Sequence, residues 1–388
     1  MTADLRYADA ERDLASAIDD LLAARSGPAE ILARTEQPET HDSGLWRALA
    51  ADIGCAGLLV PEALGGAGAS YRELAAAAER LGAFVAPVPF LGSAVVATTA
   101  ALSAAKSAAG KPGAGAAADL LRRLADGSVT AALAVPADAM PGDPFPQAVR
   151  LSGPRPGDGA ARTFRLRGSI RSVVDALPAD VLLVPAEGVP NGLYLVEATA
   201  DGVHRAPVTS LDMTRQLCDL SLDGVLARQV AVGADAAAAI EAGLAAGATV
   251  IAAEQLGLAQ RCLDMTLSYV KERQQFARPV GSFQAVKHRL ADLWAAIAQA
   301  RAASRYAAAC LASDDPDAPV AVALAKSACC EAAVTAAQEC VQLHGGVGFT
   351  WEHPAHLYLK RAKAASVMFG TPGAHRAALA ALVNLPAP

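Results

Sequence analysis

The sequence predicts an α+β protein that is mainly helical, with an N-terminal helical domain, a central antiparallel β domain and a C-terminal bundle of long helices. Hydrophobic residues make up 53% of the 388 positions and aromatic residues only 4%, because much of the apolar content is alanine. Alanine is the strongest helix former and loses no side-chain entropy on ordering. Short strand-like runs are confined to the middle of the chain, and long periodic stretches follow them. We place the domains at residues 1–127, 128–230 and 231–388.

In the first domain, apolar residues recur at three- and four-residue spacing, which predicts helices separated by glycine-rich breakers. These predicted helices are Glu11–Ala24, Leu45–Ile53, Tyr71–Leu81 and Ala116–Leu124.

In the second domain, short apolar or alternating runs are separated by Pro, Gly and Asp, which is typical of a small antiparallel sheet. The predicted strands are Ala131–Val135, Thr163–Leu166, Val181–Val184, Gly192–Val196 and Leu217–Leu222.

In the third domain, several periodic stretches exceed 25 residues and contain few breakers, which predicts long antiparallel helices. They are Ala236–Gln274, Ser282–Ala312, Ala318–Leu343 and Ala355–Phe369.

Composition and charge argue against several classes of protein. The formal net charge is -6 and the pI is near 5.7, so no basic footprint for nucleic acid is present. The seven cysteines are odd in number and scattered, which favours reduced thiols over a disulfide framework or a zinc site. The N-terminus is charged and amphipathic, unlike a secretory signal. We therefore expect a cytoplasmic protein.

Two local patterns resemble a membrane span and a metal site. The apolar stretch Ala236–Ala253 is mostly Ala and Gly and contains Glu241, so we interpret it as a buried core helix rather than a membrane span. His353 and His356 are three residues apart, but no third ligand is evident, so we expect no metal site.

The segment Glu272–Gln284 ends one predicted long helix and begins the next through a Pro/Gly turn. Arg273 offers a planar fork of donors to a phosphate group. Gln275 and Gln284 supply neutral donors, and Phe276 supplies a flat apolar face. A cation at the C-terminal end of a helix also suits the helix dipole without any ligand. Taken alone, the segment leaves both interpretations open.

The segment Gln342–Thr350 follows a long predicted helix and contains Gly345, Gly346 and Gly348. A single glycine would be an ordinary helix stop. Three glycines in four positions let the backbone approach a ligand closely and expose N–H groups to a diphosphate.

Together, the patterns R-x-Q-F-x-R-P-V-x-x-F-Q and Q-L-H-G-G-x-G-F-T resemble those of the acyl-CoA dehydrogenase family. The resemblance extends over essentially the whole chain. Val60–Gly66 is similar to the family's N-terminal loop, Leu211–Arg215 to the end of its β domain, and Gly257–Arg261 to part of its first C-terminal helix.

This resemblance implies FAD as cofactor and an acyl-CoA thioester as substrate, oxidised between its α and β carbons. In the family, a carboxylate removes the α proton, the β hydride passes to the flavin, and electrons leave through an electron-transferring flavoprotein. Each FAD is shared across a subunit interface, so a second copy or a homologous subunit is implied. The cofactor contacts that the resemblance implies are Arg273, Gln275, Phe276, Gln284, Gln342, Gly345, Gly346 and Thr371.

The sequence departs from the family at the catalytic base. The glutamate that usually precedes Gly-Thr is replaced by Phe369, and no Asp or Glu occurs between His353 and Pro388. Phenylalanine cannot accept a proton. Some relatives carry the base on the first long C-terminal helix, at a position that corresponds by spacing to Gly247. Glu254 lies on nearly the same face about 10 Å further along and remains a candidate.

A second departure lies in the β domain, where the Thr-Glu and Trp-Ile-Thr patterns that face the flavin ring are missing. Our leading hypothesis is a base-lacking subunit of a heteromeric acyl-CoA dehydrogenase, an arrangement that accompanies bulky substrates such as steroid side-chain thioesters. The first alternative is a self-sufficient homo-oligomer that uses an unconventional base such as Glu254. The second is a flavin-free scaffold that no longer catalyses.

Overall fold

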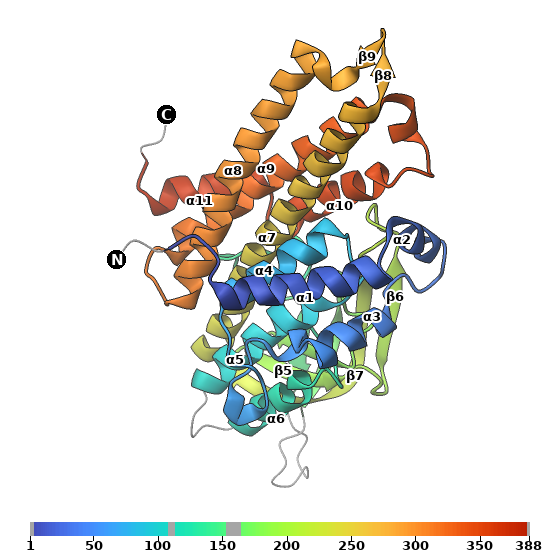
Figure 1. Cartoon of the computed structure of the whole chain (residues 1–388). Helices are drawn as coiled ribbons and strands as arrows, with labels where there is room; N and C mark the ends of the chain where they lie inside the picture. The colour runs from blue at the N-terminus through green and yellow to red at the C-terminus, as the bar shows by residue number, and fades with distance from the viewer. Residues whose placement is uncertain (1–3, 108–112, 153–163, 386–388) are drawn as a thin grey trace.

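The computed structural model describes residues 4–107, 113–152 and 164–385, and it has the predicted order of helical layer, sheet and helical bundle (Figure 1). In the first layer, α4 begins with Ser70 as N-cap, and Glu73 completes a capping box. The elements of this layer are α1 (Asp9–Arg25), α2 (Pro28–Thr35), α3 (Ser43–Arg47), η1 (Ala48–Asp52), η2 (Cys55–Gly57), η3 (Glu62–Leu64), α4 (Tyr71–Ala83), η4 (Phe90–Ala97), α5 (Thr98–Ser107) and α6 (Ala114–Ala125).

The central sheet has the order β1-β4-β5-β7-β3-β2, with β6 also paired to β7. The sheet is mixed, whereas the sequence predicted an antiparallel one: β1 runs parallel to β4, and the other pairings are antiparallel. Between them the chain passes through β2 and β3 before returning, and such a long crossover permits parallel pairing. Thr163, a predicted strand start, lies outside the described residues. The strands are β1 (Ala131–Leu133), β2 (Val149–Ser152), β3 (Phe164–Val174), β4 (Val181–Ala186), β5 (Gly192–Glu197), β6 (Val203–Val208) and β7 (Leu217–Val232).

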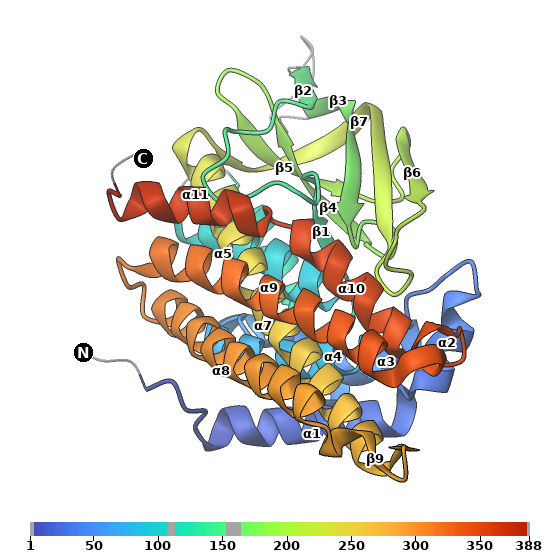
Figure 2. The ribbon, with the colours of Figure 1, turned by 90° about the horizontal axis from the view of Figure 1, so that it is seen from above.

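The C-terminal bundle contains three long helices that lie side by side, and two shorter helices lie against them (Figure 2). The last predicted helix ends two residues early, at Val367, because Met368 already has an extended backbone, and Phe369 and Gly370 follow it with left-handed φ angles. A new helix then begins with Thr371 as N-cap. The elements are α7 (Ala234–Glu272), β8 (Gln274–Gln275), β9 (Arg278–Pro279), η5 (Val280–Ser282), α8 (Gln284–Ala312), α9 (Ala318–His344), η6 (Gly345–Phe349), α10 (Ala355–Val367) and α11 (Pro372–Leu382).

Helix α7 joins the N-terminal layer to the bundle through close backbone contact with α4. A methyl group on Gly82 would lie 2.0 Å from the Glu254 carbonyl oxygen, and one on Gly257 would lie 1.8 Å from the Glu79 carbonyl oxygen. Only glycine allows two helices to approach so closely. The alanine-rich core is therefore continuous from α1 and α4 through α7 to the sheet face formed by β1 and β5.

By length and apolar composition, α7 and the helical stretch Ala318–Phe349 could each cross a membrane. Yet 72% and 67% of their most apolar windows, respectively, are buried inside the chain itself. Burial inside the fold accounts for their apolar composition, as the interpretation of Ala236–Ala253 as a buried core helix expected.

Candidate functional site

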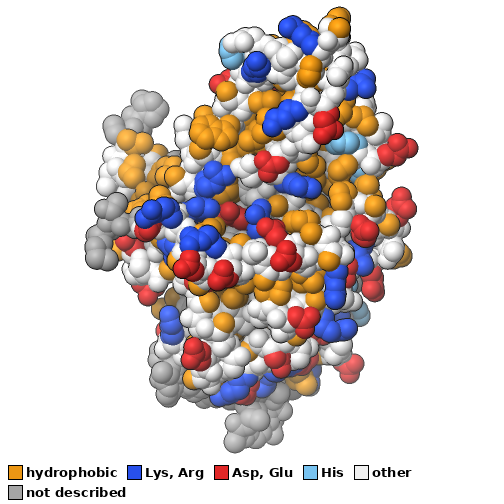
Figure 3. Space-filling view, in the orientation of Figure 1, with side chains coloured by type: hydrophobic (Ala, Val, Ile, Leu, Met, Phe, Trp, Pro, Cys, Tyr) orange, Lys and Arg blue, Asp and Glu red, His pale blue; other side chains and the backbone are white. Residues whose placement is uncertain are grey.

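The two sequence motifs meet at the end of the molecule where α7 and α9 terminate, and they enclose a groove of ≈ 450 Å³. Positive and apolar side chains gather over this end (Figure 3). The nucleotide groove, as we call it, is lined by Tyr269, Val270, Arg273, Gln275, Val280, Val286, Gln342, Leu343, His344, Gly345, Gly346 and Val347.

One wall of the groove is a hairpin that follows α7. Gln274–Gln275 pairs with Arg278–Pro279, and the two residues between them, Phe276 and Ala277, have φ angles of 54° and 56°. Such a turn normally uses Asn and Gly, so two residues with side chains are strained here. The Phe276 ring is 88% exposed. The hairpin turn therefore presents an apolar ring outward, where another molecule can cover it.

The two arginines of this motif have different roles. The Arg278 guanidinium stacks on the Phe283 ring at 3.9 Å, so it stabilises the base of the hairpin. Arg273 is exposed and lines the groove, and within the described ranges its guanidinium forms no ion pair. Its planar donors are free to bind a diphosphate.

The opposite wall is the glycine loop after α9. Gly345 has φ 63° and ψ -140°, a conformation that belongs almost only to glycine. A methyl group on Gly348 would lie 2.5 Å from the Val341 carbonyl oxygen, so packing requires that glycine too. Neither backbone angle nor packing requires glycine at position 346, because its φ is not positive and nothing lies within 4 Å of an added methyl group. The absence of a side chain at Gly346 keeps the groove open.

Sequence reasoning missed the floor of the groove. The His344 ring is 4% exposed, stacks on the Tyr269 ring with centroids 4.5 Å apart, and its Nδ1 lies 2.6 Å from the Cys340 carbonyl oxygen. Tyr269 precedes Arg273 by four residues, so one helical turn places both on the same face. That four-residue spacing is the sequence signal from which Tyr269 could have been predicted as part of the groove.

Five of the eight predicted cofactor contacts line the groove, namely Arg273, Gln275, Gln342, Gly345 and Gly346. Phe276 lies at the hairpin tip.

Two of the remaining predicted contacts have other surroundings. Gln284 begins α8, and its amide nitrogen lies 2.9 Å from Nε2 of His288. Thr371 is not brought to the groove: its hydroxyl caps α11 by accepting from Ala374 N–H at 3.1 Å, and α11 lies well away from the hairpin in Figures 1 and 2.

The two positions at which the sequence resemblance predicts a catalytic base, Phe369 and Gly247, lie against each other, and both are apolar. Phe369 is 2% exposed, and a methyl group on Gly247 would lie 2.8 Å from Cζ of the Phe369 ring. The cavity that remains beside this ring is ≈ 10 Å³ and is lined by Gly92, Val96, Leu133, Val135, Pro136, Ala137, Val174 and Phe369. That is at most room for one water, in a lining that offers apolar side chains.

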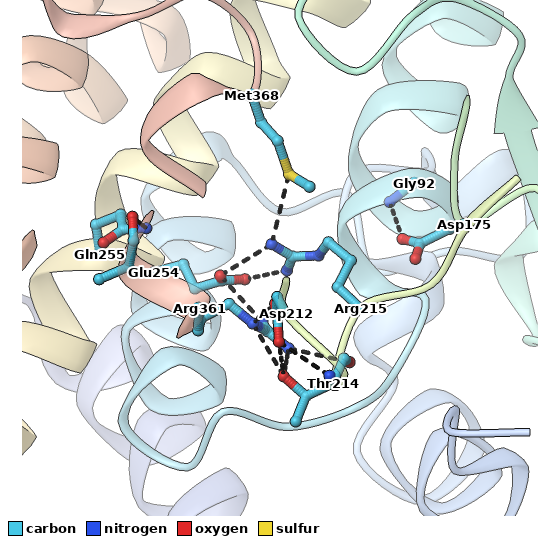
Figure 4. A network of polar contacts seen from close by, with 10 residues as sticks. Gly92, Asp175, Asp212, Thr214, Arg215, Glu254, Gln255, Arg361 and Met368 are labelled. Carbon is cyan, nitrogen blue, oxygen red and sulfur yellow. Dashed lines mark hydrogen bonds and ion pairs between the residues drawn. The ribbon is translucent and has the colours of Figure 1, made fainter. Parts of the chain in front are cut away.

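Glu254 belongs to a buried ionic network between the β domain and the bundle (Figure 4). Its carboxylate accepts from Arg215 at 2.5 and 3.1 Å and from Arg361 at 3.1 Å. Arg361 also pairs with Asp212, and its side chain is 1% exposed. The segment Leu211–Arg215 thus fastens the end of β6 and the start of β7 to α7 and α10.

This network gives Glu254 the properties of a structural anion. Burial by itself would raise the pKa of Glu254, but Arg215 and Arg361 outweigh burial and lower the pKa to about 2. A general base must accept a proton near neutral pH and must reach the substrate. The Glu254 carboxylate is bound by two buried arginines, so it neither accepts a proton near neutral pH nor is available to a substrate. Glu241, another carboxylate on α7, instead accepts from Gly142 N–H at 2.9 Å.

Asp175 is a buried carboxylate that sequence reasoning did not single out. It follows β3 with φ 54° and accepts from the N–H of Gly92 at 2.8 Å. Burial raises the pKa of Asp175, and Arg215 offsets the effect only in part. Its contact with η4 ties the sheet to the N-terminal layer. No group of three or more His, Cys, Asp or Glu side chains in the described ranges is arranged to hold a metal ion.

The chemistry available to the chain is therefore uneven. At one end, the Arg273 cation and a glycine loop that lets a ligand approach the backbone closely can bind a diphosphate. Beside Phe369, the lining of the small cavity contains no side chain that can accept a proton.

Comparison with known proteins covers nearly the whole chain. The model of the acyl-CoA dehydrogenase N-terminal domain matches residues 8–110, and that of the C-terminal domain matches residues 236–383. The acyl-CoA dehydrogenase IpdE2 of Mycobacterium tuberculosis is 35% identical over 359 residues, which is 92% of each chain. FadE27 of the same organism is 33% identical over 380 residues, 95% of each chain.

Solved structures agree. A variant described as the Tcur3481-Tcur3483 steroid ACAD is 31% identical, with a TM-score of 0.81 over 97% of this chain and 98% of that one. The ChsE4-ChsE5 complex from Mycobacterium tuberculosis is 27% identical, with a TM-score of 0.82 over 100% of both chains. The comparisons confirm the predicted resemblance and fold class. The chain belongs to the acyl-CoA dehydrogenase family of FAD-dependent oxidoreductases.

Proposed function

We propose that this chain is the base-lacking subunit of a hetero-oligomeric acyl-CoA dehydrogenase and that it completes the FAD site of a related chain. One observation carries the proposal. The chain keeps an open nucleotide groove, whereas both positions of the catalytic base, Phe369 and Gly247, are apolar and packed on each other. Glu254, the remaining candidate base, is occupied by two arginines.

The groove fits the diphosphate end of FAD, whereas the cavity beside Phe369 is too small for the flavin ring. Arg273 can neutralise the diphosphate charge, and the glycine loop around Gly346 can bring backbone N–H groups close to it. In this family the hydride from the substrate's β carbon is transferred to the bound flavin. That transfer needs space for a ring and an acyl chain, and the cavity beside Phe369 is ≈ 10 Å³.

The relatives support the choice of partner and substrate. One similar structure is a complex of two chains, ChsE4 and ChsE5, and another is described as a steroid ACAD. We propose a homologous acyl-CoA dehydrogenase chain as partner, a bulky thioester such as a steroid side-chain acyl-CoA as substrate, and an electron-transferring flavoprotein as electron acceptor. Seven free, buried cysteines suit a reducing cytoplasm.

The flavin count tests the proposal. The chain is purified alone and together with the homologous chain that co-purifies, and flavin is measured by its visible absorbance. We expect one flavin per pair of unlike chains, with acyl-CoA oxidation only in the mixed preparation. One flavin per chain and turnover by the homogeneous protein would instead establish a self-sufficient homo-oligomer. A mixed preparation without flavin would indicate a scaffold.

A further inference from the structure

We propose that Phe369 is a steric plug that closes this chain's own cleft to an acyl chain, and that Lys326 and His375 are the positioning residues that hold the plug in place. The inference deepens the proposed function, on which it rests. In the proposed pair of homologous chains, Phe369 would be the residue that keeps this chain's cleft closed while the partner's cleft stays open.

The plug fills the space between the bundle and the sheet. The Phe369 ring lies directly over Gly247 of α7, with Cζ and Cε1 only 2.8 and 2.9 Å from a methyl group built there. Val96 of η4 closes the same space at 3.0 Å from that methyl position. The glycine on α7 thus makes room for the ring, and no side chain could occupy position 247 beside it.

The backbone of the plug is strained. Phe369 has φ 51°, a left-handed angle that side chains disfavour, and it is followed by Gly370 at φ 93°. Such a conformation persists only when the surroundings hold it. This angle follows the extended Met368 at which α10 ends, and it turns the ring into the cleft.

Three hydrogen bonds from three different elements hold this turn. The Phe369 N–H donates to the Ala137 carbonyl oxygen at 2.8 Å. The Phe369 carbonyl oxygen accepts from Nε2 of His375 on α11 at 2.7 Å. The Gly370 carbonyl oxygen accepts from the Lys326 ammonium on α9 at 2.9 Å. Because a carbonyl oxygen only accepts, Nε2 of His375 carries its proton, and burial lowers the pKa of His375 in favour of that neutral ring.

Lys326 is the most unusual of these groups. It is 0% exposed, and in the described part of the chain no carboxylate pairs with it. Its ammonium reaches the carbonyl oxygens of Ala365 and Ser366 at 3.4 and 3.3 Å, at the negative end of the α10 dipole. Burying an ammonium without an anion is costly. Its contacts are concentrated on the end of α10 and the turn that carries Phe369.

The plug is tested by how much an acyl chain adds to CoA binding. Binding of octanoyl-CoA and of free CoA to the purified full chain is measured by calorimetry. The Kd of free CoA is then divided by the Kd of octanoyl-CoA, and this ratio is compared between variants. For the natural chain we expect a ratio near one, since the acyl chain has no cavity to enter. For Phe369→Ala we expect roughly a tenfold ratio or more, because several methylene groups become buried.

The matched control is Phe164→Ala, which removes another buried ring, from the sheet core instead of the cleft. Its ratio should remain near one. A ratio near one for Phe369→Ala, or a tenfold ratio in the natural chain, overturns the plug. Should Phe369→Ala fold poorly, Gly247→Ala provides a second measurement. It should lower Tm in the natural chain and lower it clearly less in a Phe369→Leu background, where only Val96 still contacts the added methyl group; equal losses in both also overturn the plug.

The positioning role of Lys326 is tested with Lys326→Met, which keeps length and removes charge. We expect the octanoyl-CoA ratio to rise and amide exchange at residues 366–371 to accelerate roughly tenfold, with exchange in α8 unchanged. The control is Lys287→Met, on the exposed side of α8. Unchanged exchange at the turn, or equal acceleration throughout the bundle, overturns this role.

The two proposals fail separately. If the flavin count gives one flavin per chain, the proposed function falls whatever the acyl ratio is. If the count is one per mixed pair but Phe369→Ala gains no acyl binding, only the plug falls.

Discussion

The change Glu254→Gln separates a structural carboxylate from a catalytic base. The glutamine leaves Arg215 buried without its closest anion, while Arg361 keeps Asp212. Removing one partner of a buried ion pair costs about 3–5 kcal/mol. An unfolding entropy of about 2.1 cal/mol/K per residue gives about 0.8 kcal/mol/K for this length, so Tm should fall by about 4–6 °C.

Differential scanning calorimetry of the purified chain measures this shift. Glu272→Gln, on an exposed position of the same helix, is the matched control and should move Tm by less than about 1 °C. An unchanged Tm for Glu254→Gln, together with loss of acyl-CoA turnover by the homogeneous chain, would refute the structural assignment and make Glu254 the base.

Three further outcomes are expected. Arg273→Ala should weaken binding of ADP about 10- to 100-fold by calorimetry, because a charge-assisted hydrogen bond contributes about 1.5–3 kcal/mol, and the difference should shrink at high salt. Gly346→Val should weaken ADP binding at unchanged Tm, whereas Gly348→Ala should lower Tm by about 1–4 °C through its clash with the Val341 carbonyl oxygen. Folding lowers the pKa of Glu254 from 4.5 to about 2, so its ionised carboxylate adds about 3 kcal/mol to the free energy of unfolding. This contribution is complete above about pH 4.5 and is lost as the pH falls through about 2. In an acid titration, Glu254→Gln should not show this loss of stability.

The sequence predicted most of the fold because its signals are local. Alanine-rich periodicity located the long helices of the bundle to within a few residues of α7, α8 and α9. The parallel pairing of β1 with β4 was not predictable in this way, since partner choice in a sheet depends on the path of the chain between strands. The early end of α10 escaped prediction for a similar reason. Nothing in the residues before Phe369 stops a helix; contacts with Ala137, Lys326 and His375 do.

The candidate site was likewise predictable only where its signals are local in the sequence. The arginine turn and the glycine loop were recognisable as motifs, because each is contiguous and each bears the residue types that bind a diphosphate. Their meeting in one groove, with Tyr269 and His344 as its floor, required the packing of α7 against α9.

By itself the sequence determined the order of the three layers, the family, and the lack of an acidic residue at the usual base position, since all three follow from residue identity and local pattern. The tertiary structure decided what replaces that base. It placed the Phe369 ring over Gly247 and enclosed Glu254 between two arginines. Both results depend on residues that are far apart in the chain, 39 positions for Arg215 and Glu254 and more than a hundred for Arg361 and Glu254 and for Phe369 and Gly247. Only packing brings such residues within contact distance.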